Sequence, residues 1–190
     1  MKEAANDKRV ERTREALFGA FFGLVLERPY EDIKVDDILE RSGVGRSTFY
    51  EHFDGKDDIL AVSLRHPLPP LADAMRARDN TADIVGVLEH FWENRAIIPG
   101  IFTGPARAVV SAVLVELIEE RFKLDRVGSP YPLLIPPRLA AIQIAEGLLA
   151  PVTAWLLGES KCTAEALAQA LRQTAMATLE AQRQRPLGKI

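Results

Sequence analysis

Residues 43–56, GVGRSTFYEHFDGK, bring together side chains that suit three kinds of chemistry. Two glycines beside basic and hydroxyl residues are typical of a loop that cradles a phosphate. The aromatic residues suit a packed core, whereas polar groups on a short helix suit the reading of DNA bases. The sequence on either side of this segment has to distinguish the three.

The spacing of the glycines disfavours a phosphate-binding loop. Gly43 and Gly45 form a G-x-G, but no third glycine follows at the required spacing. No strand is predicted before them, so the loop would also lack the element that normally leads into it.

Enzyme motifs are missing from the sequence as well. The histidines His52, His66 and His90 are scattered, and there is no C-x-x-C, H-E-x-x-H or G-x-S-x-G. The single cysteine, Cys162, excludes an internal disulfide, offers no cluster of metal ligands and is expected to fill a half-buried gap. We therefore expect a protein that is not an enzyme, with no catalytic residues, no bound metal and no cofactor.

Composition is that of a globular chain with a core of its own. The 190 residues are 47% hydrophobic and 27% charged. No apolar run approaches the roughly 18 residues of a membrane helix, and the charged start, MKEAANDKRVERTRE, lacks the apolar region of a signal peptide. We therefore expect a cytoplasmic protein with no membrane partner.

Net charge argues against a broadly basic domain. The chain has a net charge of −3, and residues 1–66 contain 11 lysines and arginines against 14 aspartates and glutamates. If this part binds DNA, a local basic face has to do so, because attraction to phosphates needs positive charge.

Helical periodicity predicts three helices around the opening segment. In residues 9–27 the apolar groups recur at spacings of three, four and seven, which marks one helical face. A second helix is predicted over 35–42, with acidic residues in its first turn, where they favour the helix dipole. Gly43 follows at the position where a helix end commonly needs a left-handed residue. Gly45 is a modest N-cap for a third helix over 46–53.

The third helix has two faces of different chemistry. Phe49 and Phe53 share one face, and we expect both to pack in the core. The opposite face presents Ser47, Thr48, Tyr50 and Glu51, with Arg46 and His52 at its flanks. A dense set of hydrogen-bonding groups at a helix N-terminus is the feature that helix-turn-helix proteins place in the DNA major groove.

Every later segment is also predicted to be helical. A helix over 56–66 is stopped by PLPP at 67–70, where we place a connection between two functional halves. The further predicted helices are 71–78, 82–95, 104–124, 137–157 and 163–183. No alternation is long enough for a strand, so we expect an all-α fold.

Residues from about 9 to 60 resemble the DNA-binding domain of the TetR family of bacterial transcriptional regulators. The usual run of that family is of the kind G-V-S-x-G-T-x-Y-x-H-F-x-x-K-x-x-L. The matching residues of this sequence are Gly43, Val44, Thr48, Tyr50, His52, Phe53, Lys56 and Leu60, and Tyr30, Val35 and Ile38 fit as well. The resemblance covers about a quarter of the chain. It implies a three-helix helix-turn-helix DNA-binding domain over 8–55, with the motif at about 35–53, and a helical regulatory and dimerisation domain over 56–190.

The resemblance also implies which residues bind DNA. The set is Arg12, Lys34, Arg46, Ser47, Thr48, Tyr50, His52 and Lys56. The first three residues of the third helix would face base edges, and the two-pronged donor of Arg46 suits a guanine. The others would hold the phosphate backbone. For Tyr50 and His52 the alternative is partial packing with the polar tip in water.

Three positions depart from the family pattern. Gly45 stands where the family often has a serine cap, and Lys34 replaces a frequent threonine cap. Glu51 lies on the exposed face, where it either repels phosphates or accepts from a cytosine amino group. The role of Glu51 stays open.

For the C-terminal half the resemblance implies a homodimer through the last two long helices, about 137–157 and 163–183. Both helices have apolar stripes, formed by Leu139, Ile142, Leu149, Val152 and Leu156 in the first and by Ala166, Leu167, Ala170, Leu171, Thr174 and Leu179 in the second. An intramolecular core explains the same stripes equally well.

The resemblance further implies a pocket for a small-molecule effector, which we expect among helices 71–124. The candidate lining residues are Met75, His90, Phe91, Trp92, Phe102 and Phe122, with His90 as the polar contact. Each of them is alternatively a core residue, and nothing in the sequence identifies the ligand.

With the helix-turn-helix pattern, the resemblance implies a homodimeric repressor that binds a near-palindromic double-stranded DNA operator and is released by a small-molecule effector. Two alternatives remain: a helical carrier or unrecognised enzyme built around a cavity, and an interaction module that keeps the helix-turn-helix only for placement on DNA.

Overall fold

A computed structural model describes residues 2–96, 98–125 and 132–183, and every regular element in these ranges is a helix. The elements are α1 (Lys2–Glu27), η1 (Tyr30–Asp32), α2 (Val35–Ser42), α3 (Arg46–Tyr50), α4 (Lys56–Leu64), α5 (Pro69–Ala72), η2 (Asp73–Met75), α6 (Thr81–Glu93), α7 (Ile98–Phe102), α8 (Ala106–Asp125), α9 (Pro137–Leu156) and α10 (Ala164–Ala181). Extended pairing in the described ranges is limited to one bridge between Leu133 and Arg183. The expectation of an all-α fold is confirmed.

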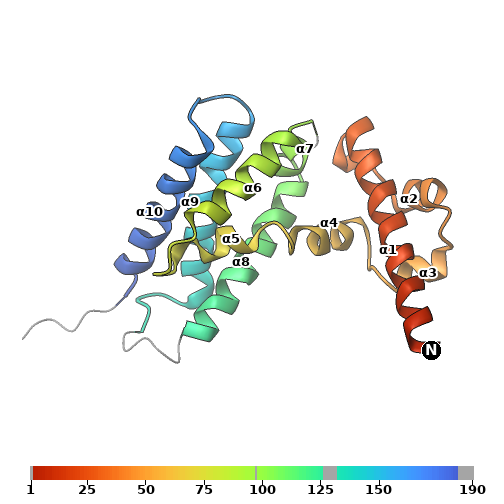
Figure 1. Cartoon of the computed structure of the whole chain (residues 1–190), viewed down its shortest axis with the longest axis horizontal. Coiled ribbons are helices and arrows are strands. Elements are labelled where there is room, and N and C mark those ends of the chain that lie inside the picture. Colours follow the sequence, from red (N-terminus) through yellow and green to blue (C-terminus); the bar gives the residue numbers. More distant parts are fainter. Residues whose placement is uncertain (1, 97, 126–131, 184–190) are drawn as a thin grey trace, which may run out of the picture.

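Helices α1, α2 and α3 lie together at one end of the molecule, and α4 leads from them to the other helices (Figure 1). The long helix α1 packs against α2 and, less extensively, against α4. The far end of α4 packs against α8. The DNA-reading candidates and the C-terminal helices are therefore joined through α4.

The turn between α2 and α3 has the backbone that the sequence predicts. Gly43 adopts a left-handed conformation with φ of 68°, and its N–H donates to the Leu39 carbonyl at 3.0 Å. The Val44 N–H donates to Ser42 Oγ at 3.2 Å. Gly45 is extended and begins α3 without a side-chain cap. The predicted glycine turn and the weak cap are both confirmed.

Aromatic side chains fill the space between the first three helices. Phe21 and Phe49 are completely buried, and Phe53 is nearly so. The Phe21 and Tyr30 rings meet edge to face at 6.2 Å, as do those of Phe18 and Phe53 at 5.7 Å. Edge-to-face pairs add to the stabilisation from area burial. The prediction that Phe49 and Phe53 belong to the core is confirmed.

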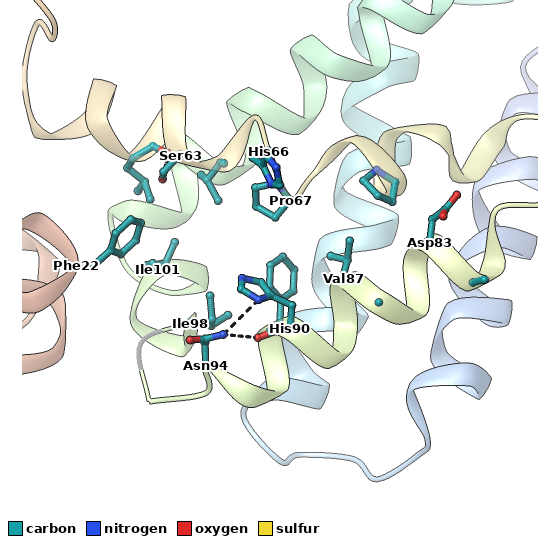
Figure 2. A pocket seen from close by; sticks show the side chains of 16 residues that line it. Phe22, Ser63, His66, Pro67, Asp83, Val87, His90, Asn94, Ile98 and Ile101 are labelled. Atoms are coloured by element: carbon teal, nitrogen blue, oxygen red, sulfur yellow. Dashed lines mark hydrogen bonds between the residues drawn. The ribbon is translucent and has the colours of Figure 1, made fainter. Parts of the chain in front are cut away.

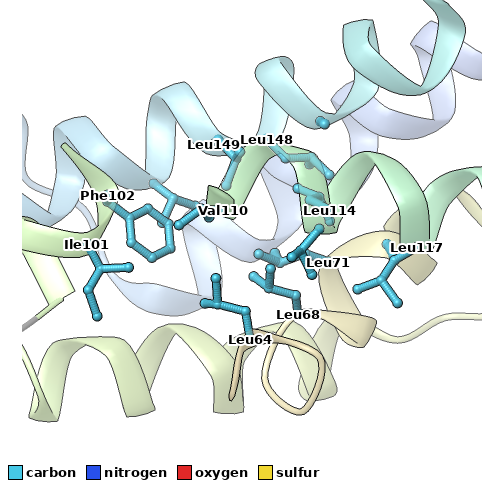
Figure 3. Close-up of a cluster of buried hydrophobic side chains, with 14 of the residues drawn as sticks. Leu64, Leu68, Leu71, Ile101, Phe102, Val110, Leu114, Leu117, Leu148 and Leu149 are labelled. Atoms are coloured by element: carbon cyan, nitrogen blue, oxygen red, sulfur yellow. The ribbon is translucent and has the colours of Figure 1, made fainter. Parts of the chain in front are cut away.

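The C-terminal helices pack around α9. Helix α9 lies against α8 and α10, and α10 in turn packs on α6 and η2. Figure 3 shows leucines from the end of α4 and from α5 meeting side chains of α7, α8 and α9. Thr163 caps α10 by accepting from the Ala166 N–H at 3.2 Å.

Some boundaries differ from the sequence predictions. Helix α3 ends at Tyr50 instead of residue 53, because its last turn tightens and the His52 N–H donates to the Phe49 carbonyl three residues back. The predicted helix 71–78 is replaced by the short elements α5 and η2, and α7 occupies a segment predicted as a break. Cys162 is exposed, so it does not fill a half-buried gap.

One helix is apolar enough to cross a membrane by length and composition alone. It is α9, and half of its most apolar window is buried inside the molecule. The prediction that no run of this length exists was wrong for Pro137–Leu156. A core helix of a soluble protein passes the same test, so this feature is weak evidence for a membrane span.

Candidate nucleic-acid interface and ligand cavity

The first turns of α2 and α3 are joined by an ion pair. Nη2 of Arg46 contacts Oδ1 of Asp36, and the two side chains are 58% and 71% exposed. Arg46 is the first residue of α3, and Asp36 is in the first turn of α2. A guanidinium has five N–H donors in a planar fork, so it can hold one carboxylate and still offer donors to a base edge.

The face of α3 that points away from the core is polar and accessible. Tyr50 is 50% exposed although its neighbour Phe49 is completely buried. Arg46 and Ser47 are exposed and Thr48 is half-buried. A short helix with one buried face and a polar N-terminal face has the form needed to enter a major groove.

Lys56 is held at the start of α4 by the segment before α2. Its Nζ donates to the Tyr30 carbonyl at 2.6 Å and to the Glu31 carbonyl at 3.2 Å, and it lies 4.5 Å from the centroid of the Tyr30 ring. The Tyr30 hydroxyl donates to Asp57. Burial, together with this hydrogen bond, raises the pKa of the Tyr30 hydroxyl. A phosphate at Lys56 would therefore share the ammonium with two backbone carbonyls.

Lys34 is the N-cap residue of α2, and it is exposed. The Lys34 N–H donates to Oδ2 of Asp37 at 2.7 Å, and Nη2 of Arg28 lies 3.1 Å from the same oxygen. The backbone hydrogen bond and, after it, the Arg28 charge hold the pKa of Asp37 below its usual range. Asp37 thus fixes the start of α2 and leaves the Lys34 side chain to solvent.

Two arginines of α1, Arg12 and Arg14, lie two residues apart in the sequence. Arg12 is exposed, and the Arg14 guanidinium lies 5.9 Å from the centroid of the Phe53 ring. His52 is half-buried, with its ring 6.4 Å from that of Phe53. The predicted DNA-binding set omits Arg14. Arg14 could have been found from the sequence, because it lies four residues before Phe18 and therefore on the same face of α1, and Phe18 also contacts Phe53.

Glu51 is exposed at the C-cap of α3. Nothing in the structure explains an acid at this position.

A second candidate site is a cavity of about 880 Å³ between α1, α4, α6 and α7 (Figure 2). Its walls are mainly apolar, and it is open to solvent on one side. The lining residues are Phe22 from α1, Leu60, Ser63 and Leu64 from α4, His66, Pro67 and Pro70 from the segment that follows, Ala82, Asp83, Gly86, Val87, His90, Phe91 and Asn94 from α6 and its end, and Ile98 and Ile101 from α7. This volume lies in the range of sites for small molecules.

Two of the six predicted ligand-binding residues, His90 and Phe91, line this cavity. Met75, Phe102 and Phe122 are buried elsewhere in the core, and the Trp92 ring packs at a tilt against that of Trp155, with the ring centroids 4.9 Å apart.

Sequence reasoning missed the contributions of Phe22, Ser63 and His66 to the cavity. The part of the lining formed by α6 and its end did have a signal in the sequence. Polar or small residues recur at 83, 86, 90 and 94, and this spacing of three and four places them on one helical face.

The apolar stripes of α9 and α10 divide between two surfaces. Leu149, Val152 and Leu156 of α9 and Leu167, Leu171 and Leu179 of α10 are buried within the chain. The exposed members are Leu139 and Ile142 on α9 and Ala166, Ala170 and Thr174 on α10. Met176 is exposed as well. Part of the stripes is intramolecular core, and part remains available to a second surface.

A metal site would need several ligating side chains close together. Among residues 2–96, 98–125 and 132–183, no group of three or more His, Cys, Asp or Glu side chains could hold a metal ion.

Comparison with known proteins agrees with the helix-turn-helix geometry. Residues 22–62 match the family model of bacterial regulatory proteins of the tetR family. Two proteins of Bacillus subtilis strain 168 are similar. The HTH-type transcriptional regulator YxbF is 37% identical over 73 residues, which are 38% of this chain and 19% of YxbF. YwcC, of the same description, is 37% identical over 54 residues, which are 28% of this chain and 24% of YwcC. The matched segments thus span less than a quarter of either relative.

Solved structures resemble the whole fold. A TetR transcriptional regulator from Streptococcus agalactiae 2603V has a TM-score of 0.59 at 23% identity, over 91% of this chain and 98% of that chain. FadR of Thermus thermophilus, a TetR-family repressor solved with lauroyl-CoA, has a TM-score of 0.54 at 19% identity, over 93% and 98%. The shared architecture is a helix-turn-helix followed by a helical C-terminal part. Residues 22–62 are thus similar to the helix-turn-helix segment of the tetR family of bacterial regulatory proteins, and the chain shares the fold of these solved structures.

Proposed function

We propose that this chain is a repressor that binds a specific DNA operator through α3. The observation that supports this most is the exposed polar N-terminal face of α3 over a buried Phe49. Arg46, Ser47 and Thr48 read base edges, with Arg46 on a guanine. The phosphate contacts come from Arg12, Lys34, Tyr50, His52 and Lys56. Arg14 joins them from beside the Phe53 ring.

In this proposal residues 8–55 form the DNA-binding domain and residues 56–190 the regulatory and dimerisation domain, and the protein acts in the cytoplasm. The positive charge of the proposed DNA interface comes from a few exposed residues. Arg12, Arg46 and Lys34 are exposed, although the whole chain has a net charge of −3. Local positive groups are enough for phosphate binding when acidic side chains elsewhere point away from the duplex.

We propose that the exposed faces of α9 and α10 form a homodimer interface. Leu139 is 52% exposed and Ile142 is 39% exposed on α9, and small residues on α10 allow a close approach of helices. A two-fold dimer presents two recognition helices to successive major grooves of a near-palindromic operator, roughly 34 Å apart.

The dimer is tested by sedimentation of Ile142→Glu. A buried carboxylate at the interface should give a monomer at concentrations where the wild type is dimeric. Leu26→Glu is the matched control, because Leu26 is an exposed apolar residue of α1, and it should leave the dimer intact. A dimeric Ile142→Glu protein would refute this interface.

We propose that a small-molecule effector in the cavity releases the DNA. The cavity touches Phe22 of α1 as well as α6 and α7. The start of α4 is held by the hydrogen bond from Lys56 to the Tyr30 carbonyl. Its end is held by an ion pair with α8, in which Nη2 of Arg65 lies 2.6 Å from Oε2 of Glu116. A ligand that prefers one arrangement of these helices shifts the population toward it, by no more than its preference for that arrangement.

The proposed function is tested by selecting DNA from a random duplex pool with the full-length protein. Wild type should enrich one near-palindromic sequence, and Arg46→Ala should cost about 1–3 kcal/mol and relax one base position in each half-site. Lys34→Ala should weaken all sequences alike. Selection that enriches no sequence would contradict the proposal.

The two alternatives are distinguished by other measurements. A carrier or enzyme keeps its cellular activity when Arg46 and Tyr50 are both changed to alanine. An interaction module occupies many operator-like sites and shows no effector response.

A further inference from the structure

The described walls of the cavity between α1, α4, α6 and α7 offer no permanent positive charge. Among the sixteen described residues that line it, none is lysine or arginine, and Asp83 is the one carboxylate. Moving a carboxylate, sulfate or phosphate into apolar surroundings without a cation is strongly unfavourable. The cavity therefore disfavours anionic ligands.

The polar residues of the cavity lining include a histidine and an amide joined to each other, the exposed His90 and the half-buried Asn94. Nδ2 of Asn94 donates to the His90 carbonyl at 2.8 Å and lies 3.4 Å from Nδ1 of His90. An asparagine amide nitrogen is only a donor, so Nδ1 of His90 accepts. In the tautomer that this contact favours, the ring proton is on Nε2, which presents a donor.

The placement of this donor defines what it can bind. The His90 ring projects from α6 toward the segment of His66 and Pro67, and Asn94 lies on its other side (Figure 2). Around it are Phe91, Val87 and Ile98, which suit hydrocarbon or aromatic surfaces. A donor beside apolar walls that lack a permanent cation favours an uncharged molecule with a well-placed acceptor oxygen.

We propose that this cavity takes an uncharged, mainly apolar ligand with a carbonyl-type oxygen, and that Nε2 of His90 donates to that oxygen. This inference rests on the proposed function, in which the cavity holds the effector. It adds the chemical class of the ligand and the atom that selects it.

Gly86 provides a way to fill the cavity without damaging the fold. It is exposed on α6, lines the cavity, and a Cβ added there would meet no atom of the described residues within 4 Å. Leucine also has a higher helix propensity than glycine, so Gly86→Leu should fold at least as well as the wild type. Gly19→Leu is the matched control, because Gly19 lies in α1, has equally open space and does not line the cavity.

The probes are two dyes of different charge. Nile red is uncharged, aromatic and bears a carbonyl oxygen, whereas 1-anilinonaphthalene-8-sulfonate is an anion. Titrations of the full chain without DNA, followed by dye fluorescence, should show Nile red binding at least tenfold more tightly than the sulfonate. Gly86→Leu should weaken Nile red binding at least tenfold, and Gly19→Leu should change it less than twofold.

The histidine is tested by two substitutions with the same probe. His90→Leu removes the donor and should weaken Nile red binding about fivefold, the loss expected for one hydrogen bond. His90→Gln keeps an N–H donor and should retain most of the affinity. The proposal is overturned if Nile red does not bind, if the sulfonate binds as tightly, or if Gly86→Leu or His90→Leu behaves as the wild type.

Failure of this inference is distinguishable from failure of the proposed function. Dye binding is measured without DNA, and operator selection is measured without ligand. Selective duplex binding with no preference for Nile red would refute only the proposed ligand class. Nile red binding without selective duplex binding would refute the proposed repressor function and would leave the inference about the cavity intact.

Discussion

Arg46, the first residue of α3, forms an ion pair with Asp36 in the first turn of α2. The residue that we propose to read a guanine is thus partly neutralised in the free protein. In the proposed complex with DNA, the guanidinium either keeps Asp36 and uses its remaining donors or exchanges the carboxylate for the base edge. In both cases Asp36 places a negative charge near the phosphates.

We expect Asp36→Asn to strengthen binding to all duplexes. One unit charge at about 4 Å in water is worth about 1 kcal/mol, so affinity should rise about fivefold at low salt, with little sequence dependence. Fluorescence anisotropy with operator and scrambled duplexes measures this. Glu159→Gln makes the same charge change at an exposed position after α9, where it should have no effect. Weaker binding by Asp36→Asn would mean that the ion pair is needed to hold Arg46.

Adjacent aromatic residues on α3 should respond in opposite ways. Phe49 is completely buried, so Phe49→Ala should lower the free energy of unfolding by about 3–5 kcal/mol. Tyr50 is 50% exposed, so Tyr50→Ala should change stability little but weaken duplex binding about fivefold to tenfold, the loss of roughly one hydrogen bond. Denaturant unfolding and anisotropy separate the two effects. A Phe49→Ala protein as stable as the wild type would contradict the core around this ring.

If Lys56 binds phosphate as we propose, it links DNA binding to the stability of the fold. Its ammonium donates to the Tyr30 and Glu31 carbonyls, so Lys56→Met should lower the free energy of unfolding by about 1–2 kcal/mol as well as weaken all duplexes. Lys161→Met, at an exposed lysine between α9 and α10, is the control for loss of one charge. Unchanged stability in Lys56→Met would mean that its carbonyl contacts contribute nothing to the fold.

Asp37 should make the stability of the fold depend on pH in the acidic range. The Lys34 N–H and Arg28 lower the pKa of Asp37 in the folded state, so its stabilisation is fully present above the ordinary aspartate range. That contribution is lost as pH falls through the lowered pKa. Thermal melts between about pH 6 and pH 2 should therefore show a smaller fall for Asp37→Asn than for the wild type. Glu40→Gln, on the same helix, controls for charge, and an identical fall in both variants would refute the assignment.

The helix-turn-helix could be predicted from sequence because its constraints are local. Gly43 needs a left-handed backbone, and the four-residue spacing of Phe49 and Phe53 marks the buried face. The spacing still holds after α3 ends at Tyr50, because residues 51–53 continue as a tight turn. Periodicity therefore predicted the buried face correctly and the end of the helix incorrectly.

Contacts between elements could not be predicted in the same way. The pair of Asp36 and Arg46 depends on how α2 crosses α3, and no pattern within either helix encodes that angle. The cavity likewise lies where Phe22 of α1 faces α6. Residue type marked Met75 and Phe102 as apolar, but it did not say that they face the core instead of the cavity.

The central claim is that α3 reads a specific DNA sequence, and the most direct test is a salt titration of duplex binding by the full-length protein. At each salt concentration anisotropy gives the affinities for the selected operator and for a scrambled duplex of equal length. Both affinities should fall as salt rises, because phosphate contacts release counterions, and the operator should stay at least about a thousandfold tighter. Equal affinities for the two duplexes, or binding that does not change with salt, would contradict the account.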